Sequence, residues 1–150
     1  MRTLVLHSRY FGNWPIKDNY NNTFQVCDGS YDKYTIKTLH VRIRGEHENV
    51  PDLVITIEND KTSAMVSYQD DKPEWSVNYD VDLSSSFFGL KLDSPINVVV
   101  KDLFADDVGL ITEVAVDIVA SRWWGLGTEV VNHAYASFET VDFKTAKRHK

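Results

Sequence analysis

The stretch Trp75-Ser76-Val77-Asn78-Tyr79-Asp80-Val81-Asp82-Leu83 decides the fold class. Its apolar residues occupy every second position, and each residue between them is polar. Successive side chains of an extended strand point to opposite faces, so this pattern gives a strand one apolar face and one polar face. Five consecutive matches to a period of two favour a strand over a helix. We therefore predict a half-buried β-strand over residues 75–83.

The composition extends this prediction to the rest of the chain. There are 18 Val, 8 Ile and 10 Thr, against 10 Leu, 7 Ala and 2 Met. Branching at Cβ suits a pleated sheet better than a helix. Further segments of apolar or alternating residues lie at 23–27, 34–44, 53–58, 62–69, 96–100, 108–119 and 130–143. Strands at this spacing predict an all-β fold, an eight-stranded antiparallel β-sandwich.

Length and charge limit the role of such a domain. The 150 residues suit a single domain, with a core over about 23–143, an N-terminal extension over 1–22 and a polar tail over 144–150. A net charge of −6 is the wrong sign for a general nucleic-acid binder. We expect a cytoplasmic protein, because no apolar run approaches the roughly 18 residues of a transmembrane helix and the start of the chain does not match a signal peptide.

Four landmarks follow one another in a fixed order. A Lys-Thr pair opens one strand, and a proline stands two residues before a tryptophan at the next. An apolar strand then leads to an aspartate, and an Asp-Asp pair precedes an apolar residue and a glycine. They are Lys61-Thr62, Pro73 with Trp75, Ile96–Asp102, and Asp106-Asp107-Val108-Gly109. In this order the sequence resembles the C2 domain family over about residues 34–143. The resemblance implies a C2-like β-sandwich that binds calcium and phospholipid.

Three acidic loops meet at one end of the sandwich if the layout of that family holds. They are residues 45–52, 69–73 and 102–107, and these 19 residues contain eight of the 22 acidic residues. Two like charges about 4 Å apart repel by roughly 1 kcal/mol in water, and a calcium ion with about six to eight oxygen ligands would relieve that repulsion. Carried over by position, the ligands are Asp52, Asp102, Asp106 and Asp107, with Glu46 and Asp71 as auxiliaries.

A bound calcium ion would also favour contact with a membrane. It would reduce the negative charge, and the phosphate of an anionic phospholipid could complete its coordination. Leu103 and Phe104, at the tip of the third loop, would then enter the membrane surface. The resemblance thus implies calcium-dependent, peripheral membrane association. Calcium-binding members of the family usually have an aspartate at the position of Phe104, so the alternative is that these acids are solvated turn residues that hold no ion.

Two aromatic pairs, Phe87-Phe88 and Trp123-Trp124, lie in connections expected at the opposite end of the sandwich. Either these rings close the bottom of the core, or they form a patch that contacts a protein or a sugar. The alternative function is therefore calcium-independent: a protein-interaction, structural (for example viral) or carbohydrate-binding β-sandwich.

The sequence gives little support for catalysis. It contains no Gly-x-Ser-x-Gly and no His-Glu-x-x-His motif. Cys27 lies in an expected hairpin, with no histidine that the sequence places beside it. His47, flanked by Glu46 and Glu48, has surroundings that could hold a metal, although a surface histidine of a loop is the simpler interpretation. We predict that the protein is not an enzyme.

Overall fold

The computed structural model describes residues 1–150 apart from 19, 69–74, 105–106, 124–126, 134–138 and 143–150. The elements in chain order are β1 (Arg2–Pro15), β2 (Tyr20–Cys27), β3 (Tyr31–His47), the 3-10 turn η1 (Val50–Asp52), β4 (Leu53–Glu58), β5 (Ser63–Met65), β6 (Ser76–Asp82), α1 (Ser84–Phe87), β7 (Lys91–Leu92), β8 (Ile96–Asp102), β9 (Gly109–Arg122), β10 (Thr128–His133) and β11 (Glu139–Asp142). In the described part of the chain, no helix is long and apolar enough to span a bilayer.

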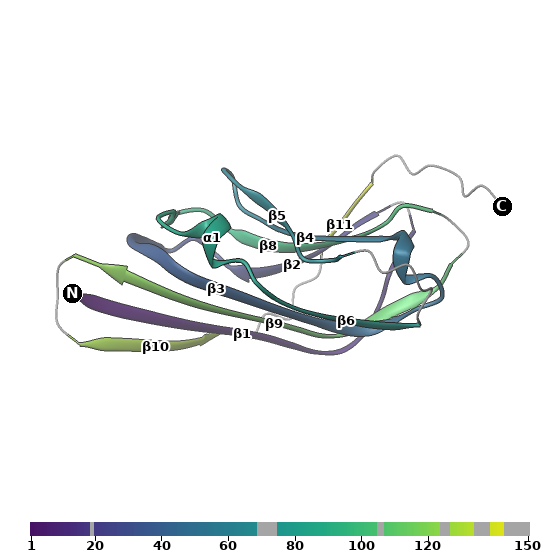
Figure 1. The fold of residues 1–150 in the computed structure, drawn as a ribbon, viewed down its shortest axis with the longest axis horizontal. Coiled ribbons are helices and arrows are strands. Elements are labelled where there is room, and N and C mark those ends of the chain that lie inside the picture. The colour runs from purple at the N-terminus through teal and green to yellow at the C-terminus, as the bar shows by residue number, and fades with distance from the viewer. Residues whose placement is uncertain (19, 69–74, 105–106, 124–126, 134–138, 143–150) are drawn as a thin grey trace.

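The strands form two sheets that lie one above the other, which confirms the all-β, sandwich-like fold (Figure 1). The larger sheet has the order β10-β1-β9-β3-β6, with β7 on β3, and the smaller has the order β11-β2-β8-β4-β5. Neighbouring strands are antiparallel except for β1 and β10, which are parallel. The described residues thus form eleven strands where the sequence predicted eight.

Strand β1 corrects the expectation of an N-terminal extension. It lies between β9 and β10 inside the larger sheet and pairs with β9 from Arg2 onward. Leu4, Leu6 and Tyr10 alternate along it and are buried in the core. The polar Ser8 at the same inward spacing interrupts the apolar pattern, although it is itself buried. For this reason the sequence indicated only a short apolar run, whereas the first 15 residues contain a full core strand.

Strand β6 confirms the strand predicted over 75–83, one residue shorter at each end. Val77 and Tyr79 are buried, and the polar residues between them are exposed. Trp75 does not follow this pattern, although the alternation predicted that it would lie on the apolar face. It lies just before the strand and is 66% exposed. The largest side chain of the stretch therefore points to solvent at the end of the sandwich.

Charged side chains cover the outer face of the larger sheet. His7 and Arg9 of β1 bond to the carboxylate of Asp117 on β9, at 2.6 and 2.7 Å. Burial raises the pKa of Asp117, but the bonds from His7 and Arg9 together outweigh it, so the pKa is lowered overall. This carboxylate therefore stabilises the fold at a pH above its unfolded pKa, and the contribution is lost as the pH falls through its folded pKa.

Two glycines let β3 and β9 approach closely near one end of the sandwich. A Cβ atom on Gly45 would lie 2.2 Å from the carbonyl oxygen of Leu110. A Cβ atom on Gly109 would lie 2.5 Å from the carbonyl oxygen of Glu46 and equally close to the ring of His47. Because a backbone atom cannot move without the strand that contains it, a side chain at either position would push the two strands apart.

The substitution Gly45→Ala should therefore destabilise the fold, by about 1–3 kcal/mol as for other overpacked sites. Urea unfolding followed by circular dichroism measures this loss. Gly12→Ala is the matched control, because the atoms nearest to a Cβ atom there belong to the side chain of Trp14, at 3.0 Å, and not to the backbone of a neighbouring strand. Equal losses in the two variants would contradict the close approach of β3 and β9.

Candidate functional site

The ends of β3 and β8 and the start of β9 meet at one end of the molecule. The N–H of Leu103 donates to the carbonyl of Asp52 at 3.1 Å. The N–H of Glu48 donates to the carbonyl of Val108 at 3.0 Å. The first and third acidic loops expected from the sequence are thus brought together, while the second, 69–73, lies outside the described residues. We call this region the loop end: residues 46–52, 75, 102–104 and 107–110.

A buried histidine–aspartate pair lies inside the loop end. The Nε2 atom of His47 is 2.8 Å from Oδ2 of Asp102, and both side chains are 0% exposed. The N–H of Asn49 donates to Nδ1 of the same ring at 3.0 Å. A ring nitrogen that accepts a hydrogen bond carries no proton, so the proton is on Nε2 and is donated to the carboxylate. In this arrangement His47 is neutral.

This pair is a link between the two sheets, because His47 ends β3 of the larger sheet and Asp102 ends β8 of the smaller one. The second carboxylate oxygen, Oδ1, accepts the N–H of Phe104 at 3.2 Å. A buried carboxylate is unfavourable unless donors satisfy it. Both oxygens of Asp102 have a donor within the protein. The structure therefore places Asp102 in the interior, where the sequence had suggested an open ion cradle.

The other expected calcium ligands differ in burial, and two of them are not described by the structure. Asp52 is buried, Asp107 is partly buried and Glu46 is exposed. Asp71 and Asp106 lie outside the described residues. Among the residues that the structure describes, no three or more His, Cys, Asp or Glu side chains are grouped so that they could hold a metal ion. Leu103 and Phe104, expected at a membrane-facing tip, are each partly exposed.

His47 was misplaced by the sequence interpretation, which favoured a surface loop. A usable signal was present, because Leu39, Val41 and Ile43 face the core at every second residue of β3. Two further steps of the same period lead through Gly45 to His47. Only the polarity of histidine, with a glutamate on either side, made this continuation look like a loop.

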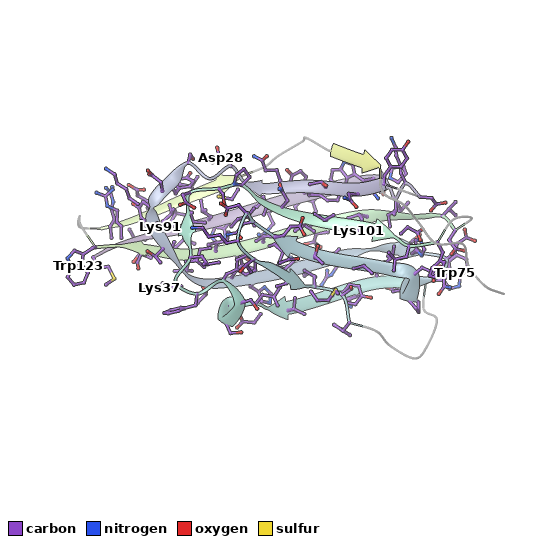
Figure 2. All side chains as sticks on the ribbon, turned by 90° about the horizontal axis from the view of Figure 1, so that it is seen from above. Asp28, Lys37, Trp75, Lys91, Lys101 and Trp123 are labelled. Atoms are coloured by element: carbon purple, nitrogen blue, oxygen red, sulfur yellow. The ribbon has the colours of Figure 1, made fainter. Side chains whose placement is uncertain are left out.

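A hollow lies at the opposite end of the molecule from the loop end. Its volume is about 580 Å3, and it is lined by Asp32, Lys33, Lys91, Arg122 and Trp123. Figure 2 shows Trp123 at one end of the long axis and Trp75 at the other. We call this site the Trp123 hollow. The indole of Trp123 is 76% exposed, and the guanidinium of Arg122 lies 5.7 Å from the centre of the Tyr34 ring, a cation–π contact that positions the charge.

The aromatic residues expected at this end have different roles. Phe87 is fully buried and belongs to the core. Phe88 is exposed, with the ammonium of Lys37 5.1 Å from its ring centre. Trp124 lies outside the described residues. Of the two interpretations, core closure therefore applies to Phe87, and an exposed aromatic surface applies to Phe88 and Trp123.

Cys27 and His47, the two side chains that the sequence analysis weighed for chemistry, are both buried. Burial raises the pKa of the Cys27 thiol, which disfavours the reactive thiolate. His47 uses both ring nitrogens in hydrogen bonds, one with Asp102 and one with the N–H of Asn49. A general base that activates a hydroxyl or thiol needs one ring nitrogen directed at that group. These two side chains therefore serve the fold in the arrangement observed.

No family model matches this chain, and no curated protein matches it. Among solved structures, a serine protease of Aeromonas sobria is similar, with a TM-score of 0.54 and 11% sequence identity. The match covers 79% of this chain and 27% of the protease chain, so this chain spans little more than a quarter of that protein's length. At this identity the likeness concerns the fold alone.

Replacing either partner of the buried pair should destabilise the protein strongly. For His47→Ala or Asp102→Ala we expect a loss of about 3–5 kcal/mol, because each leaves a buried polar partner uncompensated. The double variant should lose less than the sum of the two, with a coupling of at least about 1 kcal/mol in a double-mutant cycle.

The pair His40 and Asp80 is the matched control, because it joins the same residue types at 2.5 Å on the surface. Its coupling should stay within about 0–1 kcal/mol. Additive losses at His47 and Asp102, measured by urea unfolding, would show that these residues do not act as a pair.

Proposed function

We propose that this protein is a non-catalytic binding module whose ligand site is the Trp123 hollow and whose ligand is an acidic saccharide. The observation that carries the proposal is an exposed indole beside an open hollow lined by three cations. It develops the alternative function that the exposed aromatic residues suggested from the sequence. Calcium has no part in it.

The indole supplies the apolar part of the site. Trp123 has the highest exposed fraction of the large hydrophobic residues that the structure describes. Exposing so much apolar surface is unfavourable in a protein with no ligand, and tryptophan is enriched where partners dock. Its flat face is suited to the C–H groups on one side of a pyranose ring, while the hydroxyl groups of the sugar remain available to polar neighbours.

The charged side chains indicate what kind of sugar would bind. Lys33, Lys91 and Arg122 outnumber the carboxylate of Asp32 in the lining, although the whole chain has a net charge of −6. A neutral sugar would offer these cations no charge, whereas carboxylate or sulfate groups would form charge-assisted hydrogen bonds with them, above all with the planar guanidinium. The volume of about 580 Å3 lies within the range of about 300–1,000 Å3 typical of ligand sites.

Calcium-dependent binding to an anionic phospholipid surface stays a prediction, as does membership of the C2 family. The calcium ligands expected from the sequence include Asp102, whose two carboxylate oxygens accept hydrogen bonds from His47 and from the N–H of Phe104. Asp102 is also fully buried, so a calcium ion could reach it only if this end of the fold opened. Co-sedimentation with vesicles that contain phosphatidylserine measures the effect directly, and identical binding in calcium and in chelator would reject it.

The substitution Trp123→Ala should weaken binding of a heparin oligosaccharide by roughly thirtyfold or more, because an aromatic anchor at a binding site contributes about 2 kcal/mol or more. Isothermal titration in the presence of chelator measures the affinity. Trp75→Ala is the matched control, since it removes a similarly exposed indole from the opposite end, and it should bind as the wild type does.

Equal affinity of the Trp123→Ala variant and the wild type for heparin would contradict the proposal. So would equal binding of heparin and of neutral dextran by the wild type. Vesicles with phosphatidylserine provide a further comparison: if Trp123→Ala abolishes vesicle binding and heparin does not bind at all, the hollow is a lipid site and the saccharide assignment is wrong.

A further inference from the structure

A second hollow lies at the loop end, far from the Trp123 hollow (Figure 2). Its volume is about 210 Å3. It is lined by the buried His47 and by Glu46, Glu48, Trp75, Val108, Gly109 and Leu110. We call it the Trp75 pocket. None of its residues belongs to the proposed saccharide site, so what it binds is a separate question.

Two exposed apolar side chains, those of Trp75 and Val108, line this pocket. Trp75 is 66% exposed and Val108 is 70% exposed. The backbone holds both in place, because the carbonyl of Trp75 accepts the N–H of His47 at 2.9 Å. Val108 is joined to Glu48 by two hydrogen bonds, one in each direction. A rigid apolar surface loses little conformational entropy on binding, which favours association with a partner.

The charge around the pocket is negative. Glu46 and Glu48 are both exposed, and one oxygen of Glu48 accepts the N–H of Val108 at 2.7 Å, which fixes this carboxylate at the rim. Among the described residues that line the pocket, these two carboxylates are joined by no lysine or arginine, and the one histidine, His47, is buried. A partner that fits here must combine apolar surface with positive charge.

We infer that the Trp75 pocket docks a basic peptide segment of another protein, one in which lysine or arginine residues alternate with apolar residues. Apolar side chains of such a segment would cover Val108 and the pocket. The aliphatic stem of a lysine or arginine would lie on the indole of Trp75, with its charged group in reach of Glu46 and Glu48. Charge complementarity and the paired exposure of Trp75 and Val108 select this occupant.

The test is fluorescence anisotropy of the full chain with a labelled short peptide of alternating lysine and leucine. Trp75→Ala and the double variant Glu46→Gln with Glu48→Gln should each weaken binding by roughly tenfold, and added salt should weaken binding to the wild type. Glutamine keeps the oxygen that accepts the N–H of Val108, so the double variant removes charge while preserving the loop. Circular dichroism should show unchanged folding, because the altered side chains are exposed.

Two control variants distinguish this site from general effects. Trp123→Ala removes the exposed indole of the other end, and Asp60→Asn with Asp93→Asn removes two negative charges from exposed positions outside the pocket. Both should bind the peptide as the wild type does. Equal loss of affinity in all four variants would overturn the inference, since the loss would then not depend on whether the altered residues line the pocket.

Two further outcomes would also overturn it. The first is equal binding of a peptide of alternating glutamate and leucine. The second is self-association of the wild type in analytical ultracentrifugation that both Trp75→Ala and Trp123→Ala abolish, because the cationic end of a second copy would then be the occupant. A monomeric wild type that binds the basic peptide through Trp75 and the two glutamates is the result that the inference predicts.

Discussion

The hydrogen bond between His47 and Asp102 is the interaction on which one end of this protein depends. It joins the last residue of β3 to the last residue of β8, and so connects the two sheets, whose described strands do not pair with each other. Because Asn49 donates to the other ring nitrogen, histidine is the donor and the carboxylate is the acceptor. The close approach of β3 and β9 at Gly45 and Gly109 places the same ring against the backbone of β9. Loop conformation at this end therefore follows from interior packing.

The two ends of the sandwich differ in charge and in what they can bind. At the loop end, carboxylates surround the exposed Trp75, while the opposite end has cations around the exposed Trp123. The two proposed sites would therefore take ligands of opposite charge, one of them anionic and one of them basic. If both proposed sites are occupied together, the protein would connect two partners.

Side-chain alternation was the part of the sequence that predicted structure best. It predicted β6 to within one residue at each end. The same alternation, continued along β3 through Gly45, also predicts that His47 is buried. It failed for β1, where the inward-facing Ser8 broke the apolar pattern, and for Trp75, which lies beyond the end of its strand. Pairing between distant segments, such as the parallel contact of β1 with β10, has no local signal. The acidic loops suggested an ion site because sequence shows charge but not which carboxylate has a buried donor.

The tautomer of His47 is the most direct test of this account, and long-range proton–nitrogen NMR of the imidazole measures it. The account predicts a protonated Nε2 and an unprotonated Nδ1, with ring nitrogen shifts that do not change when millimolar calcium is added. A proton on Nδ1, or a change of the ring signals on addition of calcium, would show that Asp102 is available to an ion and would contradict the buried link between the sheets.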